Sequence, residues 1–215
     1  MKRIFYLLIL NLLFSVAQSQ EKQKNITHYL FPEFTKGVVL MKTGASKEAL
    51  LNYNALTEEM IFENNGVRLA LALVENIDTI FINDCKFFLL NGKFVELLYH
   101  SKYDLYAEHK CTIKDPGKPA GYGTSSQTGA TTTYSSFFSG NRVYDIKLPE
   151  AYETNPFTVC WLKKDGALLK FVSLRQLSKS FEDKSGLFKK YVKDNNVSYD
   201  DQKSLIGLIR FLESN

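Results

Sequence analysis

Histidine and cysteine are the side chains in this sequence that could act as a base, a nucleophile or a metal ligand. The chain holds three of each: His28, His100, His109, Cys85, Cys111 and Cys160. No CxxC pair occurs, and the spacing of the six residues does not match a zinc site. The HExxH, GxSxG and GxxxxGKS/T patterns are also absent. The sequence therefore predicts no catalytic residue, no metal and no cofactor.

One enzymatic alternative stays open, because a fold can bring distant residues together. A serine or threonine nucleophile needs a base, and His100 or His109 could serve if either lay close to one. However, His109 alternates with Tyr103, Leu105 and Ala107, and this pattern predicts that it is a partly buried histidine in a strand. No carboxylate pair for acid–base catalysis stands out. We interpret Glu96, Asp104 and Glu108 as ordinary sheet-surface acids.

Residues 121–140 differ from the rest of the chain, because fourteen of the twenty are Gly, Ser or Thr and none is charged. Four aromatic residues interrupt this segment and are the predicted ligand-binding residues: Tyr122, Tyr134, Phe137 and Phe138. Such rings can stack on a sugar or a peptide. Two interpretations remain, a flexible surface connection and a binding loop, and residues 131–134 also have the strand propensity to extend a sheet.

The odd number of cysteines leaves at least one thiol free or paired between chains. Cys85 and Cys111 are candidates for a disulfide, but the sequence does not give their separation in space. Cys160 lies in the run 157–162, which is apolar on both faces and typical of a buried strand. We therefore expect Cys160 to pack as a small buried hydrophobic residue.

Short strands and tight turns dominate residues 35–171. Three dipeptides separate strand-like runs in the manner of two-residue hairpin turns: Asn65-Gly66, Asn91-Gly92 and Asp165-Gly166. After the first turn, the alternation of residues 67–73 predicts one half-buried strand. The other predicted strands cover 37–42, 49–53, 59–63, 77–82, 86–90, 93–99, 103–110, 142–148, 157–163 and 167–172. Consecutive hairpins predict antiparallel pairing in a curled sheet, a small barrel or a sandwich.

The hydrophobic period changes from that of a strand to that of a helix after residue 172. Ser173 and Gln176 fit a capping box, and a second helix is predicted for residues 184–194. Ser198 and Asp201 fit another capping box before an apolar stripe of Leu205, Leu208, Ile209 and Leu212. The stripe predicts a helix packed on the core, with partner binding as the alternative. The expected fold class is α+β, an antiparallel β-rich body with a C-terminal cap of two to three short helices.

The first nineteen residues have the pattern of an export signal. Lys2 and Arg3 precede a largely apolar run at 4–14, and Ala17-Gln18-Ser19 offers the small residues of a cleavage site. Residue 20 is Gln, whereas a bacterial lipoprotein requires Cys there. The predicted location is periplasmic, outer-membrane-associated or secreted, with no transmembrane span after cleavage. Loss of Lys2 and Arg3 lowers the formal net charge from +4 to +2, and no basic stripe indicates a nucleic-acid partner.

Three runs carry a family likeness: GVVLMKTG at 37–44, LNYNALTEEM at 51–60 and GKPAGYGTSSQT at 117–128. In these three runs the chain resembles an uncharacterised family of exported β-rich proteins from Bacteroidetes-type bacteria. The resemblance covers most of the mature chain and implies a bacterial source. It implies no activity and no site residues.

The predicted organisation is a signal peptide at 1–19, a β-rich N-terminal domain at 20–115, a Gly/Ser/Thr-rich loop at 116–140, and strands followed by helices at 141–215. Export and the missing catalytic motifs favour a non-enzymatic binding protein. Its expected partner is a protein, peptide or glycan of the cell envelope. The alternative is a secreted hydrolase that combines a loop Ser or Thr with His100 or His109.

Overall fold

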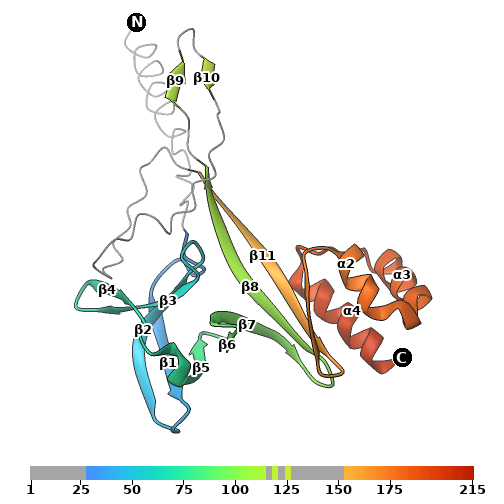
Figure 1. The fold of residues 1–215 in the computed structure, drawn as a ribbon, viewed down its shortest axis with the longest axis horizontal. Helices are drawn as coiled ribbons and strands as arrows, with labels where there is room; N and C mark the ends of the chain where they lie inside the picture. Colours follow the sequence, from blue (N-terminus) through green and yellow to red (C-terminus); the bar gives the residue numbers. More distant parts are fainter. Residues whose placement is uncertain (1–27, 115–117, 121–123, 127–152) are drawn as a thin grey trace, which may run out of the picture.

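The computed structural model describes residues 28–114, 118–120, 124–126 and 153–215 (Figure 1). The predicted signal peptide at 1–19 and the predicted strand at 142–148 lie outside these ranges. The four predicted ligand-binding residues also lie outside them: Tyr122, Tyr134, Phe137 and Phe138. Within the described ranges, an antiparallel sheet followed by a C-terminal helical segment confirms the β-rich α+β prediction.

The body of the protein is one ten-stranded sheet in which every neighbouring pair is antiparallel. The strand order is β12-β11-β8-β7-β6-β5-β1-β2-β3-β4. A closed barrel is therefore the wrong alternative for the described strands, because the end strands β12 and β4 do not pair. The bounds are β1 Thr35–Met41, β2 Ser46–Asn54, β3 Glu59–Asn64, β4 Val67–Ala70, β5 Ile77–Ile82, β6 Cys85–Leu90, β7 Lys93–His100, β8 Asp104–Lys114, β11 Glu153–Lys164 and β12 Ala167–Phe171.

The three predicted hairpin turns are confirmed, and each has backbone torsions in the left-handed region. Asn65 and Gly66 have φ angles of 51° and 77°, as a type I′ turn requires. This turn joins β3 to β4, and the other two join β6 to β7 and β11 to β12. The prediction of one strand over 67–73 is wrong beyond Ala70, because Leu73 turns the chain with a φ of 50° and leads into the 3-10 turn η1 (Val74–Asn76).

Part of the predicted 116–140 loop is a small hairpin. Strands β9 (Lys118–Ala120) and β10 (Thr124–Ser126) pair with each other in a separate antiparallel sheet. Figure 1 shows this hairpin beyond the far end of the long β8–β11 ribbon. The paired strands at 118–120 and 124–126 thus precede residues 131–134, whose residue types favour a strand.

The strands of the N-terminal half curl around their own hydrophobic core. Tyr53, Ile80 and Phe87 are fully buried in this core, which also includes Cys111 of β8. The curl brings the turn after β2 against β8, where the Cys111 N–H donates to the Ala55 carbonyl at 2.8 Å. Strand β8 therefore belongs to both halves of the sheet.

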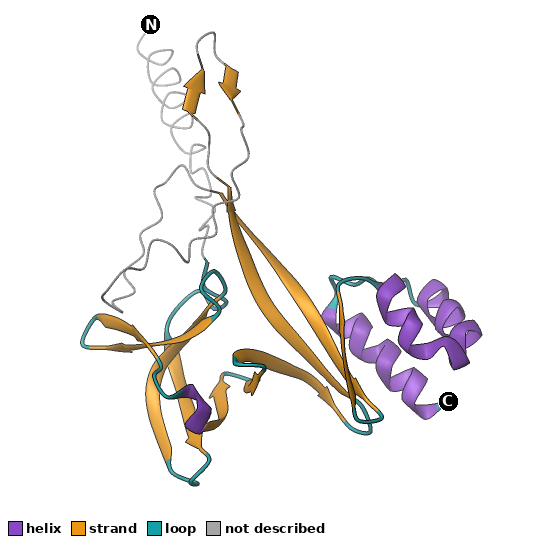
Figure 2. Ribbon diagram, in the orientation of Figure 1, coloured by secondary structure: helices purple, strands orange, loops and turns teal. Residues whose placement is uncertain are grey.

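Three helices and a 3-10 segment follow β12 (Figure 2). Their bounds are α2 Leu174–Ser178, η3 Lys179–Lys184, α3 Ser185–Asp194 and α4 Gln202–Ser214. Ser173 caps α2 as predicted, because its hydroxyl accepts from the Gln176 N–H. The second capping box is wrong: Asp201 itself is the cap of α4 and accepts from the Lys203 N–H, while the Ser198 hydroxyl accepts from Asp200.

A second hydrophobic core forms where these helices cover one face of β8, β11 and β12. Leu105 and Leu162 from the sheet are fully buried with the predicted α4 stripe: Leu205, Leu208, Ile209 and Leu212. The stripe is therefore core, as predicted from its spacing. None of the helices in the described part of the chain has the length and apolar character that a membrane crossing requires.

Substitution of Leu208 by Asp is expected to destabilise the fold strongly. Leu208 is fully buried, and a carboxylate there loses hydration without gaining a partner, at a cost of about 3 kcal/mol or more. Leu187→Asp on α3 is the matched control, because Leu187 is 38% exposed. Urea unfolding should show a large loss for Leu208→Asp and a small one for Leu187→Asp. Equal effects would show that the α4 stripe is not a packed core.

Candidate ligand-binding surface

A row of partly exposed side chains crosses the sheet face that lies opposite the helices. Because side chains alternate along a strand, Trp161 points away from the core that holds Cys160 and Leu162. Trp161 is paired in register with Tyr106 on β8 and Lys170 on β12, and Tyr106 is paired with Leu97 on β7. We call Leu97, Tyr106, Trp161 and Lys170 the Trp161 row.

Two contacts fix the position of the indole ring within this row. The Trp161 Nε1–H donates to Glu108 Oε2 at 3.0 Å, which anchors one edge of the ring. The Lys170 ammonium lies 5.3 Å from the ring centre, in a cation–π arrangement. The ring is therefore held in place by a buried acid, and the ammonium group of an exposed lysine lies over one of its faces.

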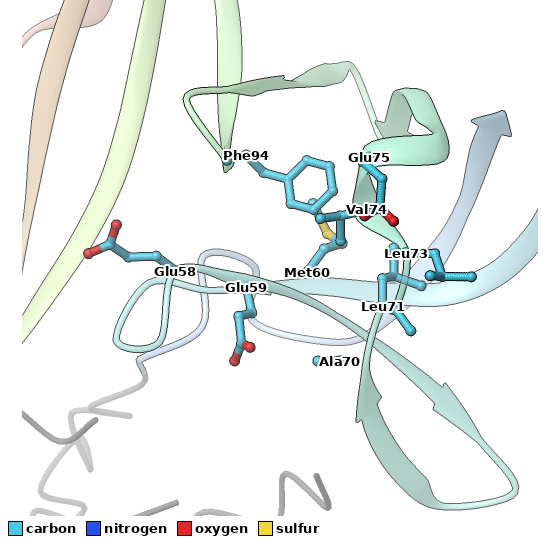
Figure 3. Close-up of a pocket in the computed structure, with 11 residues that line it drawn as sticks. Glu58, Glu59, Met60, Ala70, Leu71, Leu73, Val74, Glu75 and Phe94 are labelled. Atoms are coloured by element: carbon cyan, nitrogen blue, oxygen red, sulfur yellow. The ribbon is translucent and has the colours of Figure 1, made fainter. Parts of the chain in front are cut away.

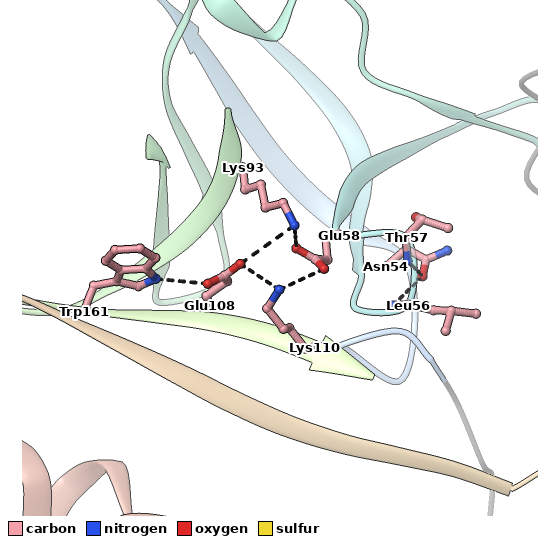
Figure 4. Close-up of polar contacts among 8 residues, drawn as sticks. All are labelled: Asn54, Leu56, Thr57, Glu58, Lys93, Glu108, Lys110 and Trp161. Carbon is pink, nitrogen blue, oxygen red and sulfur yellow. Dashed lines mark hydrogen bonds and ion pairs between the residues drawn. The ribbon is translucent and has the colours of Figure 1, made fainter. Parts of the chain in front are cut away.

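Glu108 also belongs to a four-residue charge cluster with Glu58, Lys93 and Lys110, which we call the Glu58 cluster (Figure 4). Lys110 Nζ lies 2.9 Å from Glu58 Oε1 and 2.9 Å from Glu108 Oε1. Lys93 Nζ pairs with Glu58 Oε2 and lies 4.0 Å from Glu108 Oε1. Two lysines thus bridge two carboxylates, one from the turn after β2 and one from β8.

The turn between β2 and β3 delivers Glu58 to this cluster. The Asn54 side-chain oxygen accepts from the Leu56 and Thr57 N–H groups, which tightens the turn. Glu58 follows with a φ of 60°, a left-handed conformation that is uncommon outside glycine. The ion pairs with Lys93 and Lys110 hold the carboxylate in this position.

The ionisation of the cluster follows from its hydrogen bonds. Burial alone would raise the pKa of Glu108, but hydrogen bonds from Lys110 and Trp161 outweigh it and leave the pKa below its ordinary value. Burial would lower the pKa of Lys110, but its bonds to Glu108 and Glu58 raise the pKa instead. Both side chains are therefore charged at neutral pH.

The exposed charge on this face is positive. The side chains of Lys93 and Lys163 are 46% and 56% exposed, whereas those of Glu108 and Asp104 are only 6% and 14% exposed. Asp104 is further engaged by Lys163 and by the Tyr106 hydroxyl. The lysine side chains are thus more exposed than the carboxylates with which they pair, and they border the Trp161 row.

A second polar group is enclosed in the N-terminal core. His109 Nε2 lies 2.7 Å from Glu96 Oε2, and Glu96 is also hydrogen-bonded by the Cys85 thiol. Burial and the adjacent Glu96 raise the pKa of Cys85 to about 12, so the thiol stays protonated. His109, predicted as a partly buried strand histidine, lies in β8 and is only 8% exposed. A protonated thiol beside a carboxylate is not an activated nucleophile.

The other candidate residues are dispersed. The side chain of His100 is 74% exposed and pairs with Asp104, so it does not meet His109. Cys85, Cys111 and Cys160 are all free, which leaves the Cys85–Cys111 disulfide unformed. Cys160 is buried as predicted, and burial raises its pKa to about 11. The Ser and Thr residues of the hydrolase alternative lie in 121–140, of which only 124–126 are described.

The sequence interpretation missed the residues that form this surface. The run 157–162 is not buried along both of its faces, because Phe157 is 44% exposed and Trp161 is partly exposed. Glu96 and Glu108 are not ordinary surface acids, since each is enclosed and hydrogen-bonded. The signal in the sequence was the spacing of two between Phe157, Val159, Trp161 and Lys163, which places Trp161 on the same strand face as a lysine.

Within 28–114 and 153–215, no group of three or more His, Cys, Asp or Glu side chains is arranged to hold a metal ion. Comparison of the chain with protein-family models, curated proteins and solved structures gave no match. The resemblance to exported Bacteroidetes-type proteins stays a prediction.

Proposed function

We propose that the protein is an exported, non-enzymatic binding protein of the bacterial cell envelope that holds an acidic glycan on the Trp161 row. The observation that carries the proposal is an indole fixed by Glu108 on an open sheet face and bordered by exposed lysines. The rest of the row supplies aromatic and aliphatic contact through Tyr106 and Leu97.

A glycan fits this surface better than the other partners considered for the chain. An aromatic ring offers a flat apolar face for the apolar side of a sugar, and ammonium groups favour carboxylate or sulfate substituents. The indole is already oriented, so little side-chain entropy is lost when a ligand stacks on it. Lys170 covers one ring face through a flexible stem and can move aside to contact an anionic group.

The proposed location outside the cytoplasm predicts a mature chain that begins at Gln20. The charged start at Lys2 and Arg3, the apolar run and Ala17-Gln18-Ser19 support signal-peptide removal. Mass spectrometry of the N-terminal peptide of protein purified from the envelope and culture-medium fractions of the native bacterium should find a chain that begins at Gln20, with a free or cyclised glutamine. A cytoplasmic product that retains Met1 would contradict export.

Binding of an acidic polysaccharide is expected to change the fluorescence of Trp161, the single tryptophan in the chain. Titration with polygalacturonate should give a saturable signal that weakens with added salt, and neutral dextran should give none. Lys163→Gln and Lys170→Gln should each weaken binding about threefold. Lys189→Gln on the exposed side of α3 is the matched control and should bind as the original chain does.

Calorimetry with Trp161→Ala separates stacking from charge, because this variant should lose most of its affinity while remaining folded. Aromatic and cationic surfaces also bind single-stranded nucleic acid, so oligothymidylate is the competing probe. Tighter binding of oligothymidylate than of polygalacturonate would contradict the glycan assignment. Polygalacturonate binding that Trp161→Ala leaves intact would show that the Trp161 row is not the site.

A further inference from the structure

A hollow of about 290 Å³ lies where the chain leaves β4 and passes the turn between β6 and β7 (Figure 3). Its apolar lining includes Met60 and Phe94, which are 1% and 4% exposed, together with Leu71 and Val74. Leu73 also lines the hollow and is 66% exposed. The hollow is therefore a depression with a closed apolar floor and an apolar side chain at its border.

Three glutamates line the same hollow, and they differ in their partners. The Glu58 carboxylate is neutralised by Lys93 and Lys110. No lysine or arginine in the described ranges forms an ion pair with Glu75, which lies on the same side of β3 as Met60 and Phe94, whereas the Glu59 carboxylate points to the opposite side (Figure 3). A lysine or arginine side chain matches the combination of an apolar floor and the Glu75 carboxylate, because it has an apolar stem and a cationic head.

The hollow continues directly from an unpaired sheet edge. Among the described strands, β4 pairs only with β3. The Leu71 N–H donates to the Met60 carbonyl at 2.9 Å, which fixes the alternation of hydrogen bonds along this pair. The backbone groups of Arg68 and Ala70 therefore point to the open side of β4. An extended peptide can pair with them as an added strand.

The side chain of Arg68 does not compensate the charge of the hollow. Its Nε–H donates to Glu63 Oε2 at 3.0 Å, and its guanidinium lies 4.6 Å from the centre of the Phe34 ring. Arg68 is thus engaged on the body of the sheet.

We propose that the open edge of β4 and the adjoining hollow form a binding site for an extended peptide with alternating basic and apolar residues. The peptide backbone pairs with Arg68 and Ala70, a lysine or arginine stem lies on Met60 and Phe94, and its head approaches Glu75. An apolar residue of the peptide contacts Leu73. This site shares no residue with the Trp161 row, whose members are Leu97, Tyr106, Trp161 and Lys170.

The direct test is calorimetry of the full chain with a capped pentapeptide that alternates valine and lysine. It should bind at least about tenfold more tightly than the same peptide with glutamate in place of lysine. The variant Glu75→Gln should weaken binding of the lysine peptide about threefold. Glu48→Gln is the matched control, because Glu48 is exposed on β2 and does not line the hollow.

The backbone part of the proposal has its own measurement. Ala70→Pro removes an outward N–H without removing a bond to β3, and it should weaken peptide binding while the chain stays folded. Should this variant unfold, a lysine peptide with N-methyl groups on alternate residues gives the same test with the unaltered protein, and it should not bind. Equal affinity for the lysine and glutamate peptides would overturn the proposal. Self-association of the chain without peptide binding would overturn it also, because the edge would then pair with a second copy.

Discussion

The Glu58 cluster joins the turn after β2 to strand β8, where the curled N-terminal strands return to the rest of the sheet. Among the described strands, β2, β3 and β4 pair with the rest of the sheet only through β1, yet the turn that follows β2 returns to β8. There the Ala55 carbonyl accepts from Cys111, and Glu58 pairs with Lys110. Glu58 and Lys110 are each only about one-fifth exposed, so solvent screens this pair less than a surface pair. Removal of one partner leaves a recessed charge without compensation.

Both proposed binding surfaces depend on this junction. Glu108 links the cluster to the Trp161 ring, so the same carboxylate that receives Lys110 also orients the indole. On the other side, Glu58 borders the hollow next to β4, where its charge is already neutralised. One junction therefore contributes to both surfaces. Its Glu108 holds the Trp161 ring, and its Glu58 lines the hollow.

Local sequence signals predicted the elements well because their causes are local. Asn65-Gly66 can form a tight turn without help from the rest of the chain, and Ser173 caps a helix whose first turn follows it directly. The alternation that separates Trp161 from Cys160 was also present in the sequence. By contrast, Glu58 pairs with a lysine 52 positions away, and Trp161 donates to an acid 53 positions away. Such partners are set by the register of strands distant in sequence, which periodicity does not reveal.

Hydrogen exchange of the Cys111 amide, compared between the original chain and Glu58→Gln, tests directly whether the charge cluster holds the curl in place. This amide is bonded to Ala55 at the junction, whereas the Ile80 amide lies in the central strand β5 and reports on the stability of the whole sheet. Loss of the Glu58 charge should accelerate exchange at Cys111 about tenfold more than at Ile80. Equal acceleration at both amides, or none at Cys111, would contradict the account.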